Sequence, residues 1–489
     1  MNASQPLDRA QVLSDMVFHR VPGTAAALIR DGEVVFLECY GHRDLKKTAP
    51  ITEKTLFGIA SNSKSFTSAL IAALVDEGKL EYDRPVKEYV PEFKMMDPVA
   101  TQGVTLRDML CHRTGLAPHD GLWIGDSYGR AELLRRLAYL EPSAPFRQGF
   151  AYNNTVYTLA GHVAERVTGL SWDDLIRERF FGPLGFEDST TSIKDFGPDT
   201  DYALPHYLPE GQDDAVELPM RNVDIGAPCA GINASVRDLA RWVVFQMGDG
   251  APGGQRIIST ANLNAMHNPG MVMGEGLPWD MPWLPDRIYY GLGWFNDYYR
   301  GHRHVWHAGE INGYNTFMGF LPKAGVGYAL LTNRHKPNTP FCLAQIYTML
   351  DRALALEPFD WSGAMRRAAR SPVDGAFHFP HTFDLLAKAP VADAPLSHAP
   401  ADYAGTYVSQ GYGDLVFTHN DGTFTAEWRA EEFAAEHYHY DTFKVLRVLE
   451  DVNWWSLPLE FVTDPYTGEV SKALFKLEPT VSPIEFVKE

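Results

Sequence analysis

The order of strand-like and helix-like patterns along the chain constrains the fold more than any other feature of the sequence. Near the start, apolar runs at residues 24–30 and 33–39 flank Asp31-Gly32, a pair typical of a tight hairpin turn. A second pair of apolar runs, within residues 313–332, flanks a turn that contains proline and glycine. Helical patterns lie between the two hairpins. This order predicts a mixed α/β fold (α+β), an antiparallel sheet flanked by helices, in which the first and last strands are neighbours.

Apolar residues at helical spacing, together with capping residues, predict the helices. The second of them, which starts at Ser61, should be amphipathic with its apolar residues on one face. The predicted helices span residues 7–18, 61–78, 152–169, 171–181 and 235–246.

A chain of 489 residues exceeds a single typical core and indicates more than one domain. We expect a first domain over residues 1–356. Prolines interrupt residues 357–400, which predicts a linker. Short apolar runs separated by glycine-containing turns follow in residues 401–489 and predict a small antiparallel β-barrel.

Charge and composition exclude several classes of partner. The formal net charge is -19, and such a negative field repels phosphate backbones, so we expect no nucleic-acid partner. The first residues carry no basic start followed by an apolar run, and no apolar stretch is long enough to span a bilayer. We therefore expect a cytoplasmic protein without a membrane partner. The four cysteines are far apart, which argues against a disulfide framework.

The first candidate for chemistry is the pair Ser61 and Lys64, where a loop meets a helix. A serine hydroxyl becomes a useful nucleophile only when a base removes its proton. Residues three apart share a helix face, and a lysine between apolar or cationic neighbours can lose its proton near neutral pH. This spacing also occurs by chance, and the alternative is a capped helix with a solvated lysine.

A second candidate, Tyr152 with Asn154, lies at another boundary between a loop and a helix. A tyrosine can relay a proton when a cation lowers its pKa, and the asparagine amide suits binding to Lys64 or to a substrate amide. The alternative is a buried tyrosine beside an asparagine helix cap.

The third candidate is His307, with Gly309 and Glu310, directly before the strand at Gly313. The backbone N–H of Glu310 could face that of Ser61, so that the two hold the oxyanion of an acyl-transfer intermediate. His307 could polarise the neighbouring phenol or bind a substrate carboxylate, or it could be a structural histidine in an aromatic strand.

Together these residues resemble one family. The order and separations of Ser61-x-x-Lys64, Tyr152-x-Asn154 and His307-x-Gly309 resemble the three motifs of the serine β-lactamase and penicillin-binding-protein family, in its group of class C β-lactamases, esterases and D-peptidases. Residues 105–116, 231–239 and 290–294 resemble flanking signatures of this family, so the match covers about residues 10–350. It implies a β-lactamase/transpeptidase-like fold with an all-helical subdomain. Residues 401–489 resemble the lipocalin-like barrel that follows this domain in several members.

The resemblance implies a mechanism. Ser61 attacks a carbonyl while Lys64 and Tyr152 move its proton, and water or an amine then releases the acyl group, with no metal and no organic cofactor. We expect a small-molecule or peptide substrate, with hydrolysis of amide or peptide bonds in small peptides, including D-configured or nonribosomal ones. A carboxylesterase and a thioesterase-like peptide cyclase stay open as alternatives, as does a catalytically silent ligand-binding protein. A homo-oligomer is also left open.

Departures from the family pattern also matter. Many relatives carry a small residue where Glu310 stands, so this carboxylate could attract a substrate amine, or it could be a plain surface residue. Histidine replaces lysine in the third motif, and this difference argues against a true β-lactamase. The histidine clusters at residues 302–307 and 437–439 lack matching carboxylates, so we expect no metal site. The aromatic stretch 279–294 could form a lid over the site or a packed surface loop.

Overall fold

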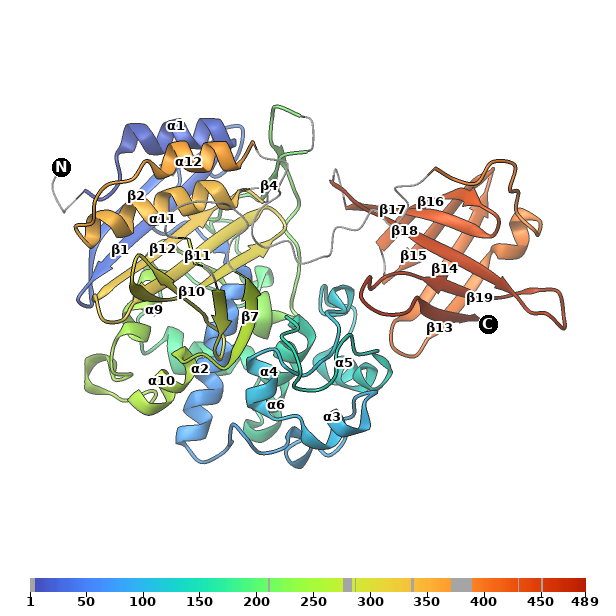
Figure 1. The fold of residues 1–489 in the computed structure, drawn as a ribbon, viewed down its shortest axis with the longest axis horizontal. Helices are drawn as coiled ribbons and strands as arrows, with labels where there is room; N and C mark the ends of the chain where they lie inside the picture. The colour runs from blue at the N-terminus through green and yellow to red at the C-terminus, as the bar shows by residue number, and fades with distance from the viewer. Residues whose placement is uncertain are drawn as a thin grey trace.

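The computed structural model describes residues 5–209, 212–275, 284–285, 287–335, 338–370, 389–429, 431–449 and 452–489. Within these residues the chain forms a sheet covered by helices and, next to it, a closed barrel (Figure 1). The predicted fold class, an antiparallel sheet flanked by helices and followed by a small barrel, is confirmed.

In the described part of the chain, the sheet has eight strands in the order β2-β1-β12-β11-β10-β9-β8-β7, and every neighbouring pair is antiparallel. The first hairpin and the last strand meet as predicted, with Ala27 opposite Ala329. Asp31 and Gly32 both have positive φ, 50° and 86°, as a two-residue hairpin turn requires. The strands are β1 (Gly23–Arg30), β2 (Glu33–Gly41), β7 (Met271–Glu275), β8 (Arg287–Tyr290), β9 (Phe295–Tyr299), β10 (His302–Ile311), β11 (Tyr314–Leu321) and β12 (Val326–Thr332).

Helices cover both faces of this sheet. Successive residues of a strand point to opposite faces. Accordingly, Ala26 and Leu28 of β1 pack in the core under one group of helices, and Ala25 and Ala27 pack in the other core. One face carries α1 (Arg9–His19), α11 (Thr339–Ala353) and α12 (Trp361–Ala368), which lie together in Figure 1. On the other face, α9 (Val236–Met247) packs against β1 and β12, and Ser235 caps it as predicted.

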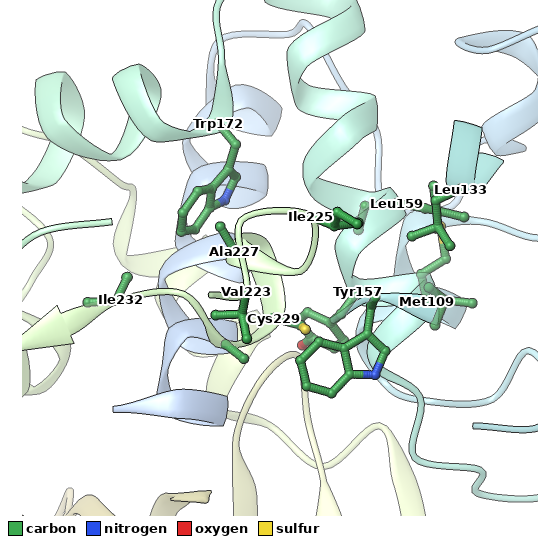
Figure 2. Packing of buried hydrophobic residues seen from close by; sticks show 14 of the residues in the cluster. Met109, Leu133, Tyr157, Leu159, Trp172, Val223, Ile225, Ala227, Cys229 and Ile232 are labelled. Carbon is green, nitrogen blue, oxygen red and sulfur yellow. The ribbon is translucent and has the colours of Figure 1, made fainter. Parts of the chain in front are cut away.

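A helical region extends from this second face. Figure 2 shows part of its core, where Trp172, Tyr157 and Cys229 pack on elements around α2 (Ser63–Asp76). The Trp172 indole donates to Thr67 of α2 at 2.9 Å. The remaining helices are α3 (Pro98–Gly103), α4 (Leu106–Leu110), α5 (Arg130–Arg136), α6 (Asn154–Thr168), α7 (Trp172–Ile176), α8 (Ala227–Ala230) and α10 (Thr260–His267). Four short strands form two pairs, β3 (Phe57–Gly58) with β6 (Asn233–Ala234) and β4 (His206–Tyr207) with β5 (Val216–Glu217).

The helix at the first motif differs from the prediction in two ways. The residues Ala60–Asn62 form a 3-10 turn, and α2 begins only at Ser63. Helical dihedrals cannot extend back past Ala60, because its φ is 47°. The helix is also buried on all sides, from Ser63 to Leu74, instead of on one face. A helix enclosed by other helices has no solvent face to keep polar.

The stretch 357–400, which we expected to be a linker, contains α12. Trp361 and Met365 of this helix are buried against the core below α11. The prolines on which the expectation rested, from Pro380 onward, all follow this helix, and residues 371–388 lie outside the described part.

After this stretch the chain forms the closed barrel. Its strands are neighbours in sequence order, and β13 closes on β20 with Tyr407 opposite Lys488. Asp421 and Gly422, both with positive φ, form the predicted turn between the second and third barrel strands. The strands are β13 (Gly405–Ser409), β14 (Gly413–Asn420), β15 (Thr423–Trp428), β16 (Glu431–His439), β17 (Thr442–Leu449), β18 (Val452–Thr463), β19 (Val470–Phe475) and β20 (Ile484–Lys488).

Candidate active site

The hydroxyl of Ser61 lies on a turn that the surrounding strands hold in place. The residue before it, Ala60, has a left-handed backbone, which costs about 1 kcal/mol for a residue with a side chain. Asn62 donates to the Thr316 hydroxyl of β11 at 2.8 Å. Gly309 of β10 runs so close that a Cβ there would lie 1.9 Å from the carbonyl oxygen of Ile59. Only glycine fits at this point, and the third motif is thereby held against the first.

Lys64 is fully buried beside this serine. Its Nζ lies 3.0 Å from Ser61 Oγ, 2.6 Å from Asn154 Oδ1 and 3.1 Å from the carbonyl oxygen of Cys229. Burial disfavours the ammonium form and lowers the pKa of Lys64 from 10.5 to about 8. A substantial fraction is therefore neutral slightly above pH 7, so the amine can accept a proton from Ser61. The alternative of a solvated lysine does not describe this side chain.

The second motif lies on the same side of the nucleophile. Burial raises the pKa of the Tyr152 phenol well above its ordinary value, and a hydrogen bond with the Ser61 side chain opposes that shift. Lys64 Nζ lies 4.7 Å from the centre of the Tyr152 ring. Asn153, not Asn154, caps α6, since its side chain accepts the N–H of Val156 at 2.9 Å. The Asn154 side chain is therefore available to bind Lys64.

His307 lies in the same cavity but contacts a different phenol from the one we expected. Its Nδ1 lies 2.6 Å from the carbonyl oxygen of Ala308, which can only accept, so Nδ1 carries the proton. Its Nε2 accepts from the hydroxyl of Tyr290 at 2.8 Å. Burial, helped by the charge of Lys64, lowers the pKa of His307 to about 3. The imidazole is thus neutral and cannot attract a carboxylate as a cation.

Glu310 follows on the same strand and is only partly covered. Its Oε1 lies 3.4 Å from Nε2 of His335, and both residues line the cavity next to Ser61. In the sheet, Glu310 stands opposite Asn315. The carboxylate therefore faces the space that a substrate would enter, as the amine-binding hypothesis requires.

Two residues of the site were not among the predicted ones. Asp120 accepts hydrogen bonds from Asn154 at 2.9 Å and from the Trp123 indole at 2.8 Å, with the same oxygen. His112 is buried, and the centre of its ring lies 4.2 Å from the centre of the Tyr152 ring. Its Nδ1 accepts the backbone N–H of Asn153. His112 belongs to the flanking signature at residues 105–116, which was a signal for it. Asp120 has no such signal, because Asn154, the site residue that it binds, is distant in sequence.

The cavity in front of Ser61 has a volume of about 300 Å³. Its lining comes both from the part of the chain that contains the eight-stranded sheet and from the barrel. The residues that line it are Ser61, Asp120, Gly121, Trp123, Ile124, Tyr152, Asn154, Arg221, Val223, Phe295, His307, Ala308, Glu310, Ile311, Asn312, Asn315, Phe317, His335, Thr339, Tyr412, Trp428, Phe433, Val445, Leu457, Phe475, Leu477 and Glu478.

Comparison with known proteins decides the family. Residues 9–351, well over half of the chain, match the family described as Beta-lactamase. The chain belongs to the beta-lactamase family. Residues 389–488 match a second family, described as a domain of unknown function, DUF3471. The chain is similar to the unguisins hydrolase of Aspergillus campestris, with 26% identity over 85% of this chain and 78% of that protein. It is also similar to penicillin-binding protein 4 of Amycolatopsis lactamdurans, with 29% identity over 64% of this chain and 81% of that one.

Two solved structures share the fold of this beta-lactamase family member. The octameric penicillin-binding protein homologue from Pyrococcus abyssi aligns over 99% of this chain and 100% of its own, with 22% identity and a TM-score of 0.60. SurE aligns over 98% of both chains, with 20% identity and a TM-score of 0.57. These alignments include the barrel, so its combination with the beta-lactamase fold recurs.

The described residues of this family member contain no group of three or more histidine, cysteine, aspartate or glutamate side chains arranged to hold a metal ion. Within the same residues, no helix is long and apolar enough to cross a membrane. The proposed lid lies partly outside the described residues, which exclude Trp279 and Trp283. The described aromatic residues Tyr290 and Trp294 are buried in the core and do not form a lid.

Proposed function

We propose that this serine hydrolase of the beta-lactamase family forms an acyl-enzyme on Ser61 and hydrolyses amide bonds of small peptides. The observation that carries the proposal is the hydrogen bond of 3.0 Å between Ser61 and a buried lysine whose pKa is lowered to about 8. This pair supplies a nucleophile and a base at neutral pH without any metal.

The reaction starts when neutral Lys64 accepts the proton of the Ser61 hydroxyl as Oγ bonds to the carbonyl carbon. The carbonyl oxygen becomes an oxyanion, which the backbone N–H groups of Ser61 and Glu310 stabilise. The C–N bond then breaks, and the leaving nitrogen takes a proton, delivered from Lys64 through Tyr152. Water attacks the resulting ester, and the same groups return its proton to Ser61. The raised pKa of Tyr152 suits a phenol that stays protonated and passes protons on.

Two observations bear on the reaction and on the substrate. A relative that covers most of the chain is named as a hydrolase of unguisins. The neutral state of His307 removes a cation that would bind the carboxylate of a β-lactam, while the partly exposed Glu310 offers a carboxylate to a substrate amine. Esterase and cyclase activity would use the same acyl-enzyme and differ in the group attached to the carbonyl or in the nucleophile that releases it.

A covalent label tests the acyl-enzyme step. The purified protein is treated with a fluorophosphonate activity probe and digested, and the modified residue is located by mass spectrometry. We expect modification at Ser61, its absence in Ser61→Ala, and a loss of amidase turnover of about 10³-fold or more in that variant. If Ser61 stays unmodified and the parent shows no turnover, the protein is a ligand-binding protein and the proposal is wrong. If the alanine variant turns over substrate as fast as the parent, Ser61 is not the nucleophile and the proposal is equally wrong.

A further inference from the structure

The cavity at Ser61 continues into the mouth of the barrel. Side chains from five barrel strands line this part, namely Trp428 of β15, Phe433 of β16, Val445 of β17, Leu457 of β18 and Phe475 of β19. Leu477, just after β19, completes the wall and is only half-buried. Because one continuous cavity joins the nucleophile to these side chains, a molecule that reaches Ser61 also meets the barrel.

This end of the cavity is apolar, since its polar groups are already bonded within the protein. The Nε2 of His119 lies 2.9 Å from the carbonyl oxygen of Glu141, so Nε2 carries the proton and Nδ1 accepts the Tyr412 hydroxyl at 2.6 Å. The Glu478 carboxylate accepts from the backbone N–H of His119 at 2.9 Å and from Thr480 at 2.6 Å. What the barrel presents to the cavity is therefore mainly aromatic and aliphatic surface.

Several contacts fix the barrel against the helical region. Arg429 donates to the carbonyl oxygen of Ile124 at 2.7 Å, and Arg221 pairs with Glu431 at 2.5 Å. The backbone at Gly121 passes so close to Trp428 that a Cβ would lie 2.4 Å from the indole ring. The shape of the joint cavity is thus set by polar bonds and by close packing on both sides.

We propose that the mouth of the barrel is the binding site for an apolar substituent of the substrate, an aliphatic or aromatic group adjacent to the carbonyl that Ser61 attacks. This inference rests on the proposed function of Ser61 and adds the chemical class of the group beside the scissile bond. The total cavity of about 300 Å³ is at the small end for ligand sites, which matches one such group together with the reacting carbonyl.

The test compares two series of esters on the full-length protein. In the first, the leaving group is fixed as p-nitrophenol and the acyl group is acetyl or octanoyl. In the second, the acetyl group is fixed and the alcohol is ethanol or benzyl alcohol. We expect kcat/KM to rise at least tenfold with the apolar group in one of the two series. The series that responds shows on which side of the carbonyl the barrel lies.

Variants of Leu477 assign that preference to the barrel. Leu477→Trp fills the mouth, and Leu477→Asp places a charge in it, so both should reduce the preference for the apolar group at least fivefold. Val487→Trp enlarges an exposed side chain on β20 and is the matched control, which should leave the preference unchanged. Because the readout is a ratio of two substrates on one protein sample, a partly unfolded variant does not imitate the result.

The outcomes separate this inference from the proposed function. A parent protein that acylates Ser61 but shows no apolar preference in either series overturns the inference and leaves the proposed function intact. A preference that both Leu477 variants retain also overturns it. Absence of any acylation of Ser61 would refute the proposed function itself, and with it the inference.

Discussion

At the scale of single residues, the site depends on the removal of Lys64 from water. Its amine contacts one hydroxyl, one amide oxygen and one backbone carbonyl oxygen, and none of these is a carboxylate that would hold the proton in place. Asp120 binds the other end of the Asn154 amide. Its charge raises the pKa of Lys64, but this is a minor effect compared with burial, which lowers that pKa. The balance favours a base that functions near neutral pH.

The rate of acylation should therefore depend on pH in a defined direction. Below its pKa, Lys64 holds a proton and cannot accept another, so kcat/KM should rise about tenfold per pH unit up to a midpoint near 8 and then level off. The pKa of His307 is lowered to about 3 and that of His112 is also well below its ordinary value, so neither titrates in this range. A pH profile of p-nitrophenyl ester hydrolysis measures this. A midpoint below 6, or an unaltered profile in Lys64→Met, would contradict the assignment.

The identities of the central residues could be predicted from the sequence, whereas their partners could not. Ser61, Lys64, Tyr152 and Asn154 were recognisable because each pair is close in sequence and because the order and separation of the pairs resemble the motifs of a known family. Asp120 became visible only in the folded chain, since it is separated from Asn154 by 34 residues. The phenol that binds His307 was likewise not predictable, because a strand pattern does not say which side chain meets the imidazole.

At the scale of elements, adjacent residues at the start of α6 have separate roles. Asn153 caps the helix and its amide also donates to the carbonyl oxygens of Leu116 at 3.2 Å and Ala117 at 2.6 Å. Asn154 belongs to the first turn of the helix and binds Lys64. The sequence places both at the boundary, but only the backbone geometry decides which one is the cap.

Because the two asparagines have separate roles, we expect one alanine variant to lose mainly stability and the other to lose mainly activity. Asn153→Ala should lower the free energy of unfolding by about 1 to 3 kcal/mol, because a cap is lost and two buried carbonyl groups lose a donor. Asn154→Ala should lower kcat/KM at least about tenfold with a smaller loss of stability, because Lys64 loses its nearest acceptor. Urea unfolding and ester hydrolysis measure the two effects. Equal losses of stability with full activity in both variants would refute the division.

At the scale of the whole molecule, the barrel contributes to the nucleophile's surroundings by contact as well as by shape. Glu478 accepts the backbone N–H of His119, and the next residue, Asp120, holds Asn154, which holds Lys64. The composition and turns of residues 401–489 predicted the barrel. They did not predict this contact, because His119 is separated from Glu478 by 359 residues.

Loss of the contact between Glu478 and His119 should change the position of Lys64 and thereby the rate of the reaction. Glu478→Ala should lower kcat about tenfold and shift the midpoint of the pH profile, because the loop that positions Asp120 loses its anchor. Glu478→Gln keeps an oxygen that can accept the His119 N–H and should restore most of the rate. Ser482→Ala, which removes a contact with Glu141 at the edge of the same interface, is the control. An unchanged kcat and pH profile in Glu478→Ala would show that the barrel does not position the loop.

The pairing of β1 with β12 has a consequence for how the chain is made. Thr24 bonds to a carbonyl oxygen 307 residues further along, so the first hairpin leaves the ribosome long before its neighbour in the sheet exists. Such distant contacts slow folding, because the long intervening loop must be closed before any strand pairing stabilises it. During most of translation the nascent hairpin carries an unpaired strand edge that is open to association with other chains.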